Sequence, residues 1–383
     1  MSKIDDLIAQ YCPNGVEYTE LQKAVKSISI PKKIGKKHYK EIGEYPIIDQ
    51  GQKYIVAYTS DHKAILPDDE YVIFGDHTRT VKFANFAFAQ GADGLKVFQP
   101  QNESIFTKFL YYVLKNLKIS NRGYNRHWSI IKNITIPIPQ LAVQEEIIKI
   151  LDTFTELEAE LEAELGARQQ QYNYYRDKLL NFDNYPVKYL PLGEVGTFIR
   201  GNGLQKKDFT EQGVGCIHYG QIYTHYGTYT NKTKSFVSPD LAGSLKTIEP
   251  GDIVIAVTSE NLEDVCKCVA WLGKETIVTG GHAMIFKHNE HPKYIAYYFQ
   301  TKNFFYQKRC FAQGTKVIDI SKTNISKIKI PIPPLAVQEE IVAILDKFDA
   351  LVNDISIGLP AEITARRQQY EHYRNKLLTF KEA

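Results

Sequence analysis

The chain contains nearly the same seventeen residues twice, as IPIPQLAVQEEIIKILD at residues 136–152 and as IPIPPLAVQEEIVAILD at residues 330–346. The copies differ only where Gln140, Ile148 and Lys149 correspond to Pro334, Val342 and Ala343. In each copy the spaced prolines require an extended backbone, and the two glutamates that follow favour a helix N-terminus. Each copy therefore predicts an extended segment that leads directly into a helix.

Both helices are expected to be long. Apolar residues recur at steps of three and four, as in a coiled-coil seam, at Ile147, Ile150, Phe154, Leu157, Leu161, Leu165, Tyr172, Tyr175 and Leu179. A second match, ARQQQYNYYRDKLLNF (167–182) against ARRQQYEHYRNKLLTF (365–380), ends the two helices. The offset between copies grows from 194 at Pro137/Pro331 to 198 at Ala167/Ala365, so the second helix carries four extra residues. They fall near SIGLPAEI (356–363), where Gly358 and Pro360 predict a break or kink.

The repeat divides the chain into four segments. Fainter matches pair residues 15–25 with 186–196 and residues 105–116 with 291–304. Runs such as EYVIFGD and DIVIAVTS predict strands bounded by turn residues. The expected fold is mixed α/β, with strand-rich modules at 1–140 and 184–335, each followed by a long helix, at 141–183 and 336–383.

Length and composition narrow the class of protein. A chain of 383 residues predicts two or three domains. It has no apolar stretch of membrane-spanning length, and its start lacks the apolar region of a signal peptide. Five scattered cysteines suit reduced thiols better than a disulfide framework. We therefore expect a cytoplasmic protein without a membrane partner.

Charge is unevenly distributed along the chain. Residues 141–183 hold four Lys/Arg and ten Asp/Glu, a balance of −6, and residues 336–383 hold six and eight, a balance of −2. Because the whole chain carries +3, the remainder, essentially the two modules, carries +11. Basic modules on an acidic spacer favour a polyanionic partner, although a solvated surface can show the same bias.

The two modules, the paired helices and the IPxPxLxxQEEI junction resemble the specificity subunit of type I restriction-modification enzymes over essentially the whole chain. The resemblance implies two target-recognition domains, each reading half of a split double-stranded DNA site. It also implies that the helices pack as an antiparallel coiled coil and contact methyltransferase subunits, through which an endonuclease/translocase subunit joins. The chain itself would be no enzyme and would need no cofactor. From the repeat we expect two methyltransferase subunits, one for each half.

Other classes of function leave weaker signals. A duplicated protein- or glycan-binding scaffold is the main alternative. The chain lacks a Walker motif, and its one Pro-Pro pair lies at the repeat junction rather than in a methyltransferase motif. Asp49 with the run Asp61-His62-Lys63 only loosely matches a metal-dependent nuclease. Cys266 and Cys268 with His282 lack a fourth credible zinc ligand.

DNA reading needs Lys and Arg for phosphates and Arg, Lys, Asn or Gln for base edges. In the first module the segments 31–40, 75–83 and 121–129 provide these residues, although the first of them also fits a mobile solvated loop. The candidates are Lys36, Lys37, His77, Arg79, Lys82, Asn121, Arg122, Tyr124, Asn125, Arg126, His127 and Trp128.

In the second module the segments 200–209, 217–234 and 312–321 provide the equivalent chemistry. The tyrosine-rich segment 217–234 equally fits a strand with one buried face. The candidates are Arg200, Gln205, Lys206, Lys207, His218, Tyr219, Gln221, Gln313, Thr315 and Lys316.

Overall fold

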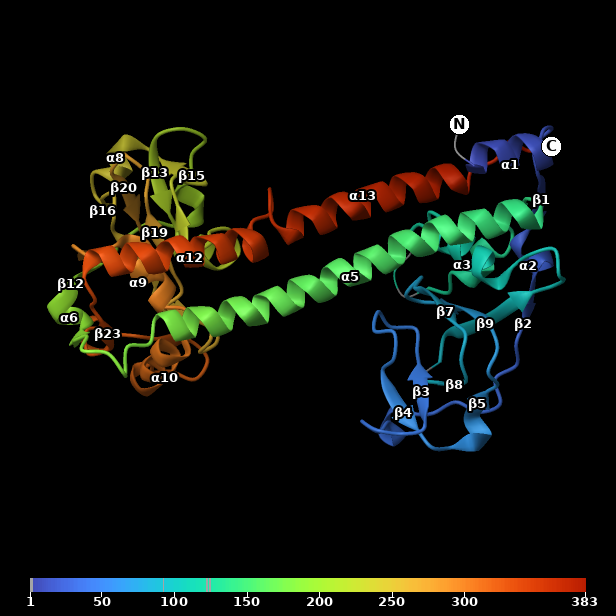
Figure 1. The fold of residues 1–383 in the computed structure, drawn as a ribbon, viewed down its shortest axis with the longest axis horizontal. Coiled ribbons are helices and arrows are strands. Elements are labelled where there is room, and N and C mark those ends of the chain that lie inside the picture. The colour runs from blue at the N-terminus through green and yellow to red at the C-terminus, as the bar shows by residue number, and fades with distance from the viewer. Residues whose placement is uncertain (1–2, 92, 122, 124) are drawn as a thin grey trace. The chain divides into compact units, whose positions relative to one another are not determined.

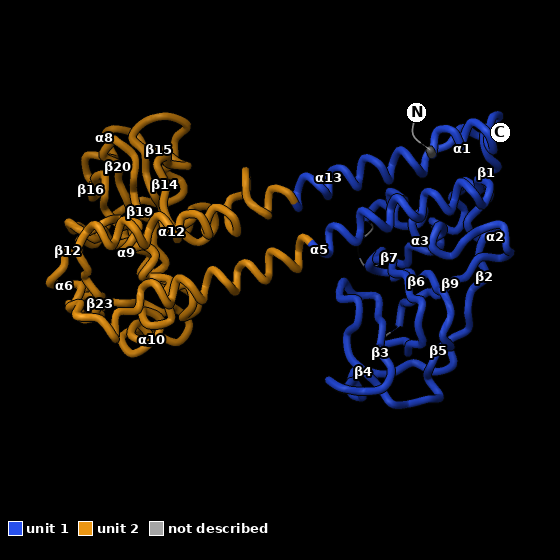
Figure 2. Tube along the Cα trace, in the orientation of Figure 1, with its two compact units in different colours: residues 1–160, 363–383 blue, residues 161–362 orange. Residues whose placement is uncertain are grey.

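The computed structural model describes residues 3–91, 93–121, 123 and 125–383 of the chain. Two compact units make up the chain, and Figure 2 colours them separately. Unit 1 holds residues 1–160 and 363–383, and unit 2 holds residues 161–362. Each unit combines one strand-rich module with parts of both repeat helices, so the units cut across the four linear segments expected from the sequence.

The longest element is α5 (Leu141–Leu179), a continuous helix that begins in unit 1 and ends in unit 2 (Figure 1). The second repeat forms two helices, α12 (Leu335–Asn353) and α13 (Leu359–Leu377). Residues 354–358 between them are not helical, which confirms the expected break. In the described part of the chain no helix has the length and apolar character that a membrane span requires.

In unit 1 the two repeats pack antiparallel. The ring of Phe154 in α5 lies against the rings of Tyr370 and Tyr373 in α13. Four residues further along α5, Glu158 pairs with Arg367, which lies earlier in α13, at 2.5 Å. Later residues of α5 thus contact earlier residues of α13, so the two helices run in opposite directions.

Unit 2 repeats this packing with the roles of the two repeats exchanged. Phe348 of α12, the counterpart of Phe154, lies against Tyr172 and Tyr175 of α5. These tyrosines are the counterparts of the ones that Phe154 contacts in unit 1. One set of aromatic contacts therefore holds the helix pair of each unit, and the expected antiparallel packing is confirmed.

The buried glutamine of the repeat explains part of the near-identity of the two copies. Gln144 is fully buried and accepts a hydrogen bond from the backbone N–H of Phe106 at 2.9 Å. Its amide nitrogen donates to the carbonyl oxygens of Ser104 and Pro139, both at 2.8 Å. Gln338 bonds one backbone N–H and one carbonyl in the same way, at 3.0 and 2.9 Å. Because each amide satisfies buried backbone groups at the start of a module helix, both copies need this residue.

The aspartate that closes the repeat fixes the same module helix to the repeat helix. Asp152 accepts from the Lys108 ammonium at 2.7 Å and from the Tyr112 hydroxyl at 2.6 Å. Asp346 in unit 2 receives equivalent bonds from a lysine and a tyrosine, at 2.6 and 2.7 Å. The repeated residues therefore form the same docking surface twice, once for each module.

The unit 1 module contains two four-stranded sheets, with the orders β2-β9-β6-β7 and β4-β3-β8-β5. Its strands are β1 (Glu17–Glu20), β2 (Val25–Ser27), β3 (Tyr45–Ile48), β4 (Ala57–Thr59), β5 (Ile65–Leu66), β6 (Tyr71–Gly75), β7 (Val81–Ala84), β8 (Phe88–Gln90), β9 (Leu95–Pro100) and β10 (Thr135–Ile138). Its short helices are α1 (Lys3–Tyr11), α2 (Leu21–Ala24), η1 (Lys36–His38), η2 (His62–Ala64), α3 (Thr107–Asn116) and α4 (Trp128–Ile131).

The unit 2 module contains a five-stranded sheet, β12-β21-β17-β19-β14, and a four-stranded sheet, β15-β13-β20-β16. Its strands are β11 (Tyr189–Pro191), β12 (Gly196–Arg200), β13 (Val214–Ile217), β14 (Tyr229–Thr230), β15 (Ser235–Val237), β16 (Lys246–Ile248), β17 (Ile253–Ala256), β18 (Thr258–Ser259), β19 (Cys268–Trp271), β20 (Ile277–Thr279), β21 (Ala283–His288), β22 (Ile318–Asp319) and β23 (Lys329–Pro331). Its short helices are α6 (Leu192–Val195), η3 (Lys206–Asp208), α7 (Tyr219–Thr224), α8 (Pro239–Ala242), α9 (Pro292–Tyr298), α10 (Lys302–Phe311) and α11 (Lys322–Ile325).

The two modules share part of their topology although their sequences diverge, and the sheet with β12 has one strand more than its counterpart in unit 1. In each, one parallel pair lies at the centre of a four-stranded sheet, β3 with β8 in unit 1 and β13 with β20 in unit 2. The first proline of each repeat lies in a two-stranded ribbon, β1–β10 or β11–β23, in which Tyr18 pairs with Pro137 and Tyr189 with Pro331. A ribbon with a free edge tolerates the missing N–H of proline.

Candidate nucleic-acid interface

Three turns at one end of the unit 1 module meet at Gln50, two residues beyond strand β3. The Gln50 amide donates to the carbonyl oxygen of Asp93 at 3.0 Å and accepts from the N–H of His77 at 3.3 Å. The hydroxyl of Thr80 donates to the backbone carbonyl of Gln50 at 2.6 Å. The turn after β3, the β6–β7 hairpin and the β8–β9 turn therefore form one connected surface, which we name the unit 1 loop end.

The loop before α4 reaches the same end through Asp76, the residue that follows β6. The backbone N–H of His127 donates to the Asp76 carbonyl at 2.9 Å, and the N–H of Trp128 donates to its carboxylate at 2.7 Å. Asn125 and Arg126, just before this junction, are exposed. The loop end thus combines a rigid anchor with side chains that face solvent.

Unit 2 builds an equivalent loop end from different side chains. Tyr219, which follows β13, lies with its ring 4.9 Å from the ring of His282 in the β20–β21 turn. His282 Nδ1 lies 3.1 Å from the hydroxyl of Thr258, which follows β17. Thr258 pairs with Asp319 in β22 and so connects the segment 312–321. The same strand ends therefore converge in both modules.

Both modules also carry a pair of adjacent lysines on a short 3-10 helix. Lys36 and Lys37 lie on η1, and Lys206 and Lys207 lie on η3. All four side chains are exposed. In each module the lysine pair lies between the edge strand of one sheet, β2 or β12, and the first strand of the parallel pair, β3 or β13.

The candidate residues differ in exposure. The exposed ones are Lys36, Lys37, Asn121, Asn125, Arg126, Arg200, Gln205, Lys206, Lys207, Gln313, Thr315 and Lys316. The partly buried ones are His77, Arg79, Trp128 and Tyr219. The buried ones are Lys82, His127, His218 and Gln221. Arg122 and Tyr124 lie outside the described residues.

The buried candidates make contacts that hold the modules together. The Lys82 ammonium donates to two backbone carbonyl oxygens at 2.7 Å, and burial lowers its pKa. His218 accepts a backbone N–H at the start of α7, and burial lowers its pKa. Gln221 donates to the hydroxyl of Ser235 at 2.6 Å. Because these atoms are shielded from solvent, we leave these residues and His127 out of the proposed direct contacts.

Two partly buried candidates are held by internal contacts. Arg79 has a left-handed backbone, with φ of 63°, and its guanidinium donates to the carbonyl of Ile119 at 3.0 Å. This conformation is rare for residues other than glycine and is tolerated where surrounding contacts enforce it. The Trp128 ring stacks on Phe98 with centroids 4.5 Å apart, so one face of this ring helps to anchor the loop before α4.

The residues of the alternative nuclease site are engaged locally. Asp49 accepts the backbone N–H of Gly51, and Asp61 pairs with the ammonium of Lys32 at 2.6 Å. No group of three His, Cys, Asp or Glu side chains that could hold a metal ion occurs in the described ranges. Burial raises the pKa of Cys266 to about 12, so its thiol stays protonated at neutral pH.

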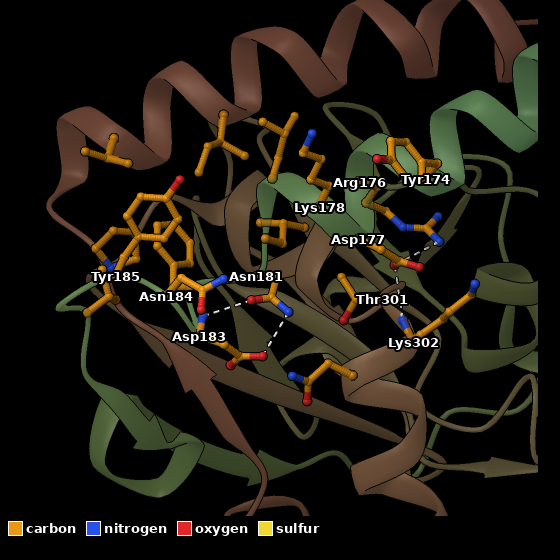
Figure 3. A pocket seen from close by; sticks show the side chains of 18 of the residues that line it. Tyr174, Arg176, Asp177, Lys178, Asn181, Asp183, Asn184, Tyr185, Thr301 and Lys302 are labelled. Atoms are coloured by element: carbon orange, nitrogen blue, oxygen red, sulfur yellow. Dashed lines mark hydrogen bonds and ion pairs between the residues drawn. The ribbon is translucent and has the colours of Figure 1, made fainter.

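A groove in unit 2 lies beside the C-terminal end of α5, with a volume of about 1370 Å³ (Figure 3). Tyr174 and Tyr185 on its rim are 61% and 66% exposed. Asp177 accepts the N–H of Lys302 at 3.2 Å and ties α10 to α5. The N-terminal part of α12 and the prolines before it complete the lining. The groove therefore consists largely of repeat residues.

Two equivalent modules with differently lined loop ends, each on a pair of repeated helices, define a protein with two separate recognition surfaces. A family model described as "Type I restriction modification DNA specificity domain" matches residues 16–167 and 185–365. The chain belongs to this family. It is therefore the DNA-recognition component of a type I restriction-modification system, with two recognition domains for a bipartite site and no catalytic role of its own.

Individual relatives agree with this assignment. The chain is 31% identical to the type I restriction enzyme EcoR124I/EcoR124II specificity subunit of Escherichia coli, over 98% of this chain and 96% of the relative. It is also 31% identical to a putative specificity subunit from Haemophilus influenzae, over 73% of each chain.

Solved structures share the fold at low sequence identity. The type I restriction-modification S subunit from M. genitalium superposes with a TM-score of 0.58 at 16% identity, over 96% of this chain and 97% of that one. A second chain comes from a study of complex assembly and conformational transition of the type I R-M system. It gives a TM-score of 0.60 at 14% identity, over 96% of this chain and 98% of that one.

Sequence reasoning missed Gln50 and Asp76, which organise the unit 1 loop end. Both come within two residues of the end of a strand, in the runs YPIIDQG and VIFGDHT. The position of a polar residue at the end of a buried strand could have indicated both, because side chains there meet the turns of neighbouring strands. Their partners lie 43 and 52 residues away, and local patterns do not reveal them.

Proposed function

We propose that each module reads one half of a bipartite double-stranded DNA site through its loop end, with the exposed candidate residues as contacts. The supporting observation is that equivalent strand ends converge in both modules but carry different side chains. A shared scaffold with different surface chemistry is suited to binding one polymer at two different sequences.

Different residues of each loop end have different roles in this proposal. The lysine pairs on η1 and η3 contact phosphates, which position each module without reading sequence. Arg126 and Asn125 in unit 1, and Gln313 and Lys316 in unit 2, offer the groups that hydrogen-bond base edges in the major groove.

Replacing Arg126 with alanine tests the division between modules. We expect the variant to lose about 1–3 kcal/mol of discrimination at the unit 1 half-site and to keep its preference at the unit 2 half-site. Lys316→Ala is the matched variant and should show the reverse. Mapping methylated sites in a strain that carries each variant measures both effects. Equal relaxation of both halves by either variant would contradict separate reading.

We also propose that two methyltransferase subunits bind, one to each unit, and that endonuclease/translocase subunits join the cytoplasmic complex through them. The support is that both units pack the same repeat residues around the same helix pair. In unit 2 the groove rimmed by Tyr174 and Tyr185 offers apolar area with polar neighbours, as expected of a protein interface.

Native mass spectrometry tests this stoichiometry with purified methyltransferase subunit. The expected species contains one copy of this chain and two methyltransferase subunits. Replacing both Tyr174 and Tyr185 with alanine should remove one of the two, because only the unit 2 surface changes. A wild-type complex with one methyltransferase subunit, or none, would contradict the proposal.

A further inference from the structure

Asp76 joins three segments of the unit 1 loop end. It is only 3% exposed, and its N–H donates to the carbonyl of Gly94 at 2.7 Å. Its carbonyl oxygen accepts both the backbone N–H and the ring Nδ1 of His127, each at 2.9 Å. Its carboxylate accepts the N–H of Trp128 at 2.7 Å. One residue thus connects the β6–β7 hairpin, the β8–β9 turn and the loop before α4.

The carboxylate of Asp76 caps the start of α4, a role that a residue next to the helix in sequence usually has. His127 occupies the N-cap position of α4, but its side chain makes no capping bond. Asp76 supplies the acceptor instead, from a segment 52 residues away in the chain. A carboxylate at a helix start satisfies an unpaired N–H and complements the local positive potential. The start of α4 therefore depends on the hairpin.

The imidazole of His127 strengthens the same junction. It is fully buried, and because a carbonyl oxygen can only accept, Nδ1 carries the hydrogen that faces Asp76. Arg126 directly precedes this fixed residue and is exposed. The backbone from which Arg126 extends is thus set by buried hydrogen bonds on its C-terminal side.

Unit 2 anchors its equivalent segment differently. The N–H of Ile320 donates to the carbonyl of Val257 at 3.1 Å, the counterpart of the backbone bond from His127 to Asp76. Val257 has no side-chain acceptor, and Ser321 caps α11 from its own segment through the N–H of Asn324 at 3.2 Å. The unit 2 segment is therefore anchored by itself and by strand pairing, whereas the unit 1 segment relies on Asp76.

We propose that Asp76 and His127 are positioning residues for DNA reading in unit 1. They hold the segment that carries Arg126 and Asn125 against the β6–β7 hairpin, so that both segments address one half-site together. The inference rests on the proposed function of the unit 1 loop end. It adds that accuracy at this half-site depends on two buried residues that do not contact DNA.

The test uses the full chain in complex with its methyltransferase subunits and maps the methylated sites. Asp76→Ala should lower base preference at the unit 1 half-site about tenfold and leave the unit 2 half-site within about twofold of wild type. Asp76→Asn retains an acceptor oxygen and should restore most of the preference. Ser321→Ala removes the equivalent cap in unit 2 and should change the unit 2 preference little, because backbone pairing holds that segment.

Each outcome has a definite meaning. If Asp76→Ala fails to fold, His127→Leu replaces it, since that change removes the Nδ1 donor and keeps a buried side chain; it should also weaken only the unit 1 half-site. No loss in the folded variant, equal loss at both half-sites, or an Asp76→Asn variant as impaired as Asp76→Ala overturns the inference. An unaffected unit 1 half-site in Arg126→Ala would instead overturn the proposed function.

Discussion

At the scale of single residues, Asp349 marks a chemical difference between the two repeats. It lies in α12 at the position that Thr155 occupies in α5. Burial raises the pKa of its carboxyl group, which accepts hydrogen bonds from Asn353 at 2.8 Å and from the Tyr172 hydroxyl at 3.4 Å. The helix pair of unit 2 therefore carries a partly buried acid at a position where the helix pair of unit 1 has a neutral residue.

Replacing Asp349 with asparagine should stabilise unit 2 at neutral pH, because the acceptor oxygen remains and the partly buried charge is removed. Since the folded-state pKa is above the ordinary value of 3.8, the folded wild type takes up protons before the unfolded chain does. Wild-type stability therefore rises as pH falls through the folded pKa, and the advantage of the variant disappears. Chemical unfolding of both chains between pH 4 and pH 8 measures the difference.

Asp354, the C-cap residue at which α12 ends, provides a control because its pKa is shifted in the opposite direction. Hydrogen bonds from Ser356 lower the pKa of this exposed carboxylate. Its contribution to stability is thus present at neutral pH and is lost as pH falls through the folded pKa, so Asp354→Asn should destabilise the neutral protein. If both variants shifted in the same direction at pH 7, the assigned pKa directions would be wrong.

The sequence shows which residues carry charge but not which of them the fold buries. Lys82 and Arg126 both read as candidate DNA contacts, yet Lys82 is buried against two carbonyl oxygens and Arg126 is exposed. Those carbonyls belong to residues about thirty positions earlier. Burial of a polar group is decided by such distant partners, and a single sequence does not record them.

At the scale of elements, the break between α12 and α13 depends on Gly358. A Cβ atom there would lie 2.4 Å from the carbonyl oxygen of Ala350 and 2.8 Å from that of Asp354, both backbone atoms that cannot move aside. Gly166 in the middle of α5 is different, because nothing lies within 4 Å of its Cβ position. The surroundings therefore require glycine at position 358 in the second repeat but leave room for a side chain at position 166 in the first.

Alanine substitutions at these glycines should change stability in opposite directions. Gly358→Ala should cost about 1–3 kcal/mol, the usual range for overpacking. Gly166→Ala should stabilise by about 0.5–1 kcal/mol, because a glycine within a helix loses more backbone entropy on folding. Both positions lie in unit 2, so urea unfolding of that unit compares them directly. Destabilisation by Gly166→Ala would show that α5 is not an unstrained continuous helix there.

Elements with strong periodicity could be predicted, and elements decided by tertiary contacts could not. The apolar steps of α5, the Gly358 break and the two runs that form β6 and β17 all appear in the structure. The segment 219–224 instead forms helix α7, although its tyrosines also fitted a strand. Its N-cap is the buried His218, whose position depends on the sheet rather than on local propensity.

At the scale of the whole molecule, the two units are equivalent constructions with the repeats exchanged. Each takes the first half of one repeat helix, with the Gln and Asp contacts to its module, and adds the tyrosine-bearing second half of the other. Helix α5 belongs to both units, with residues 141–160 in unit 1 and 161–179 in unit 2. The part of α5 between the two sets of contacts therefore links the two DNA-reading modules.

A second copy of Leu161–Glu164 inserted after Glu160 tests whether this link sets the spacing of the DNA site. Four helical residues add about 6 Å along the axis and rotate the following residues by about 40° beyond one full turn, so the packing faces stay nearly aligned. Because a base-pair step of DNA is about 3.4 Å, the unread gap should lengthen by one or two base pairs while both half-sites keep their sequence. The non-helical residues 354–358, where the second repeat already carries its four extra residues, can absorb the length mismatch in the other half of the helix pair.

A two-residue insertion at the same point is the matched control. It turns the later residues by about 200° and should abolish recognition of any bipartite site. Mapping methylated sites for both variants decides the question, and an unchanged gap in the four-residue variant would mean that α5 does not set the spacing.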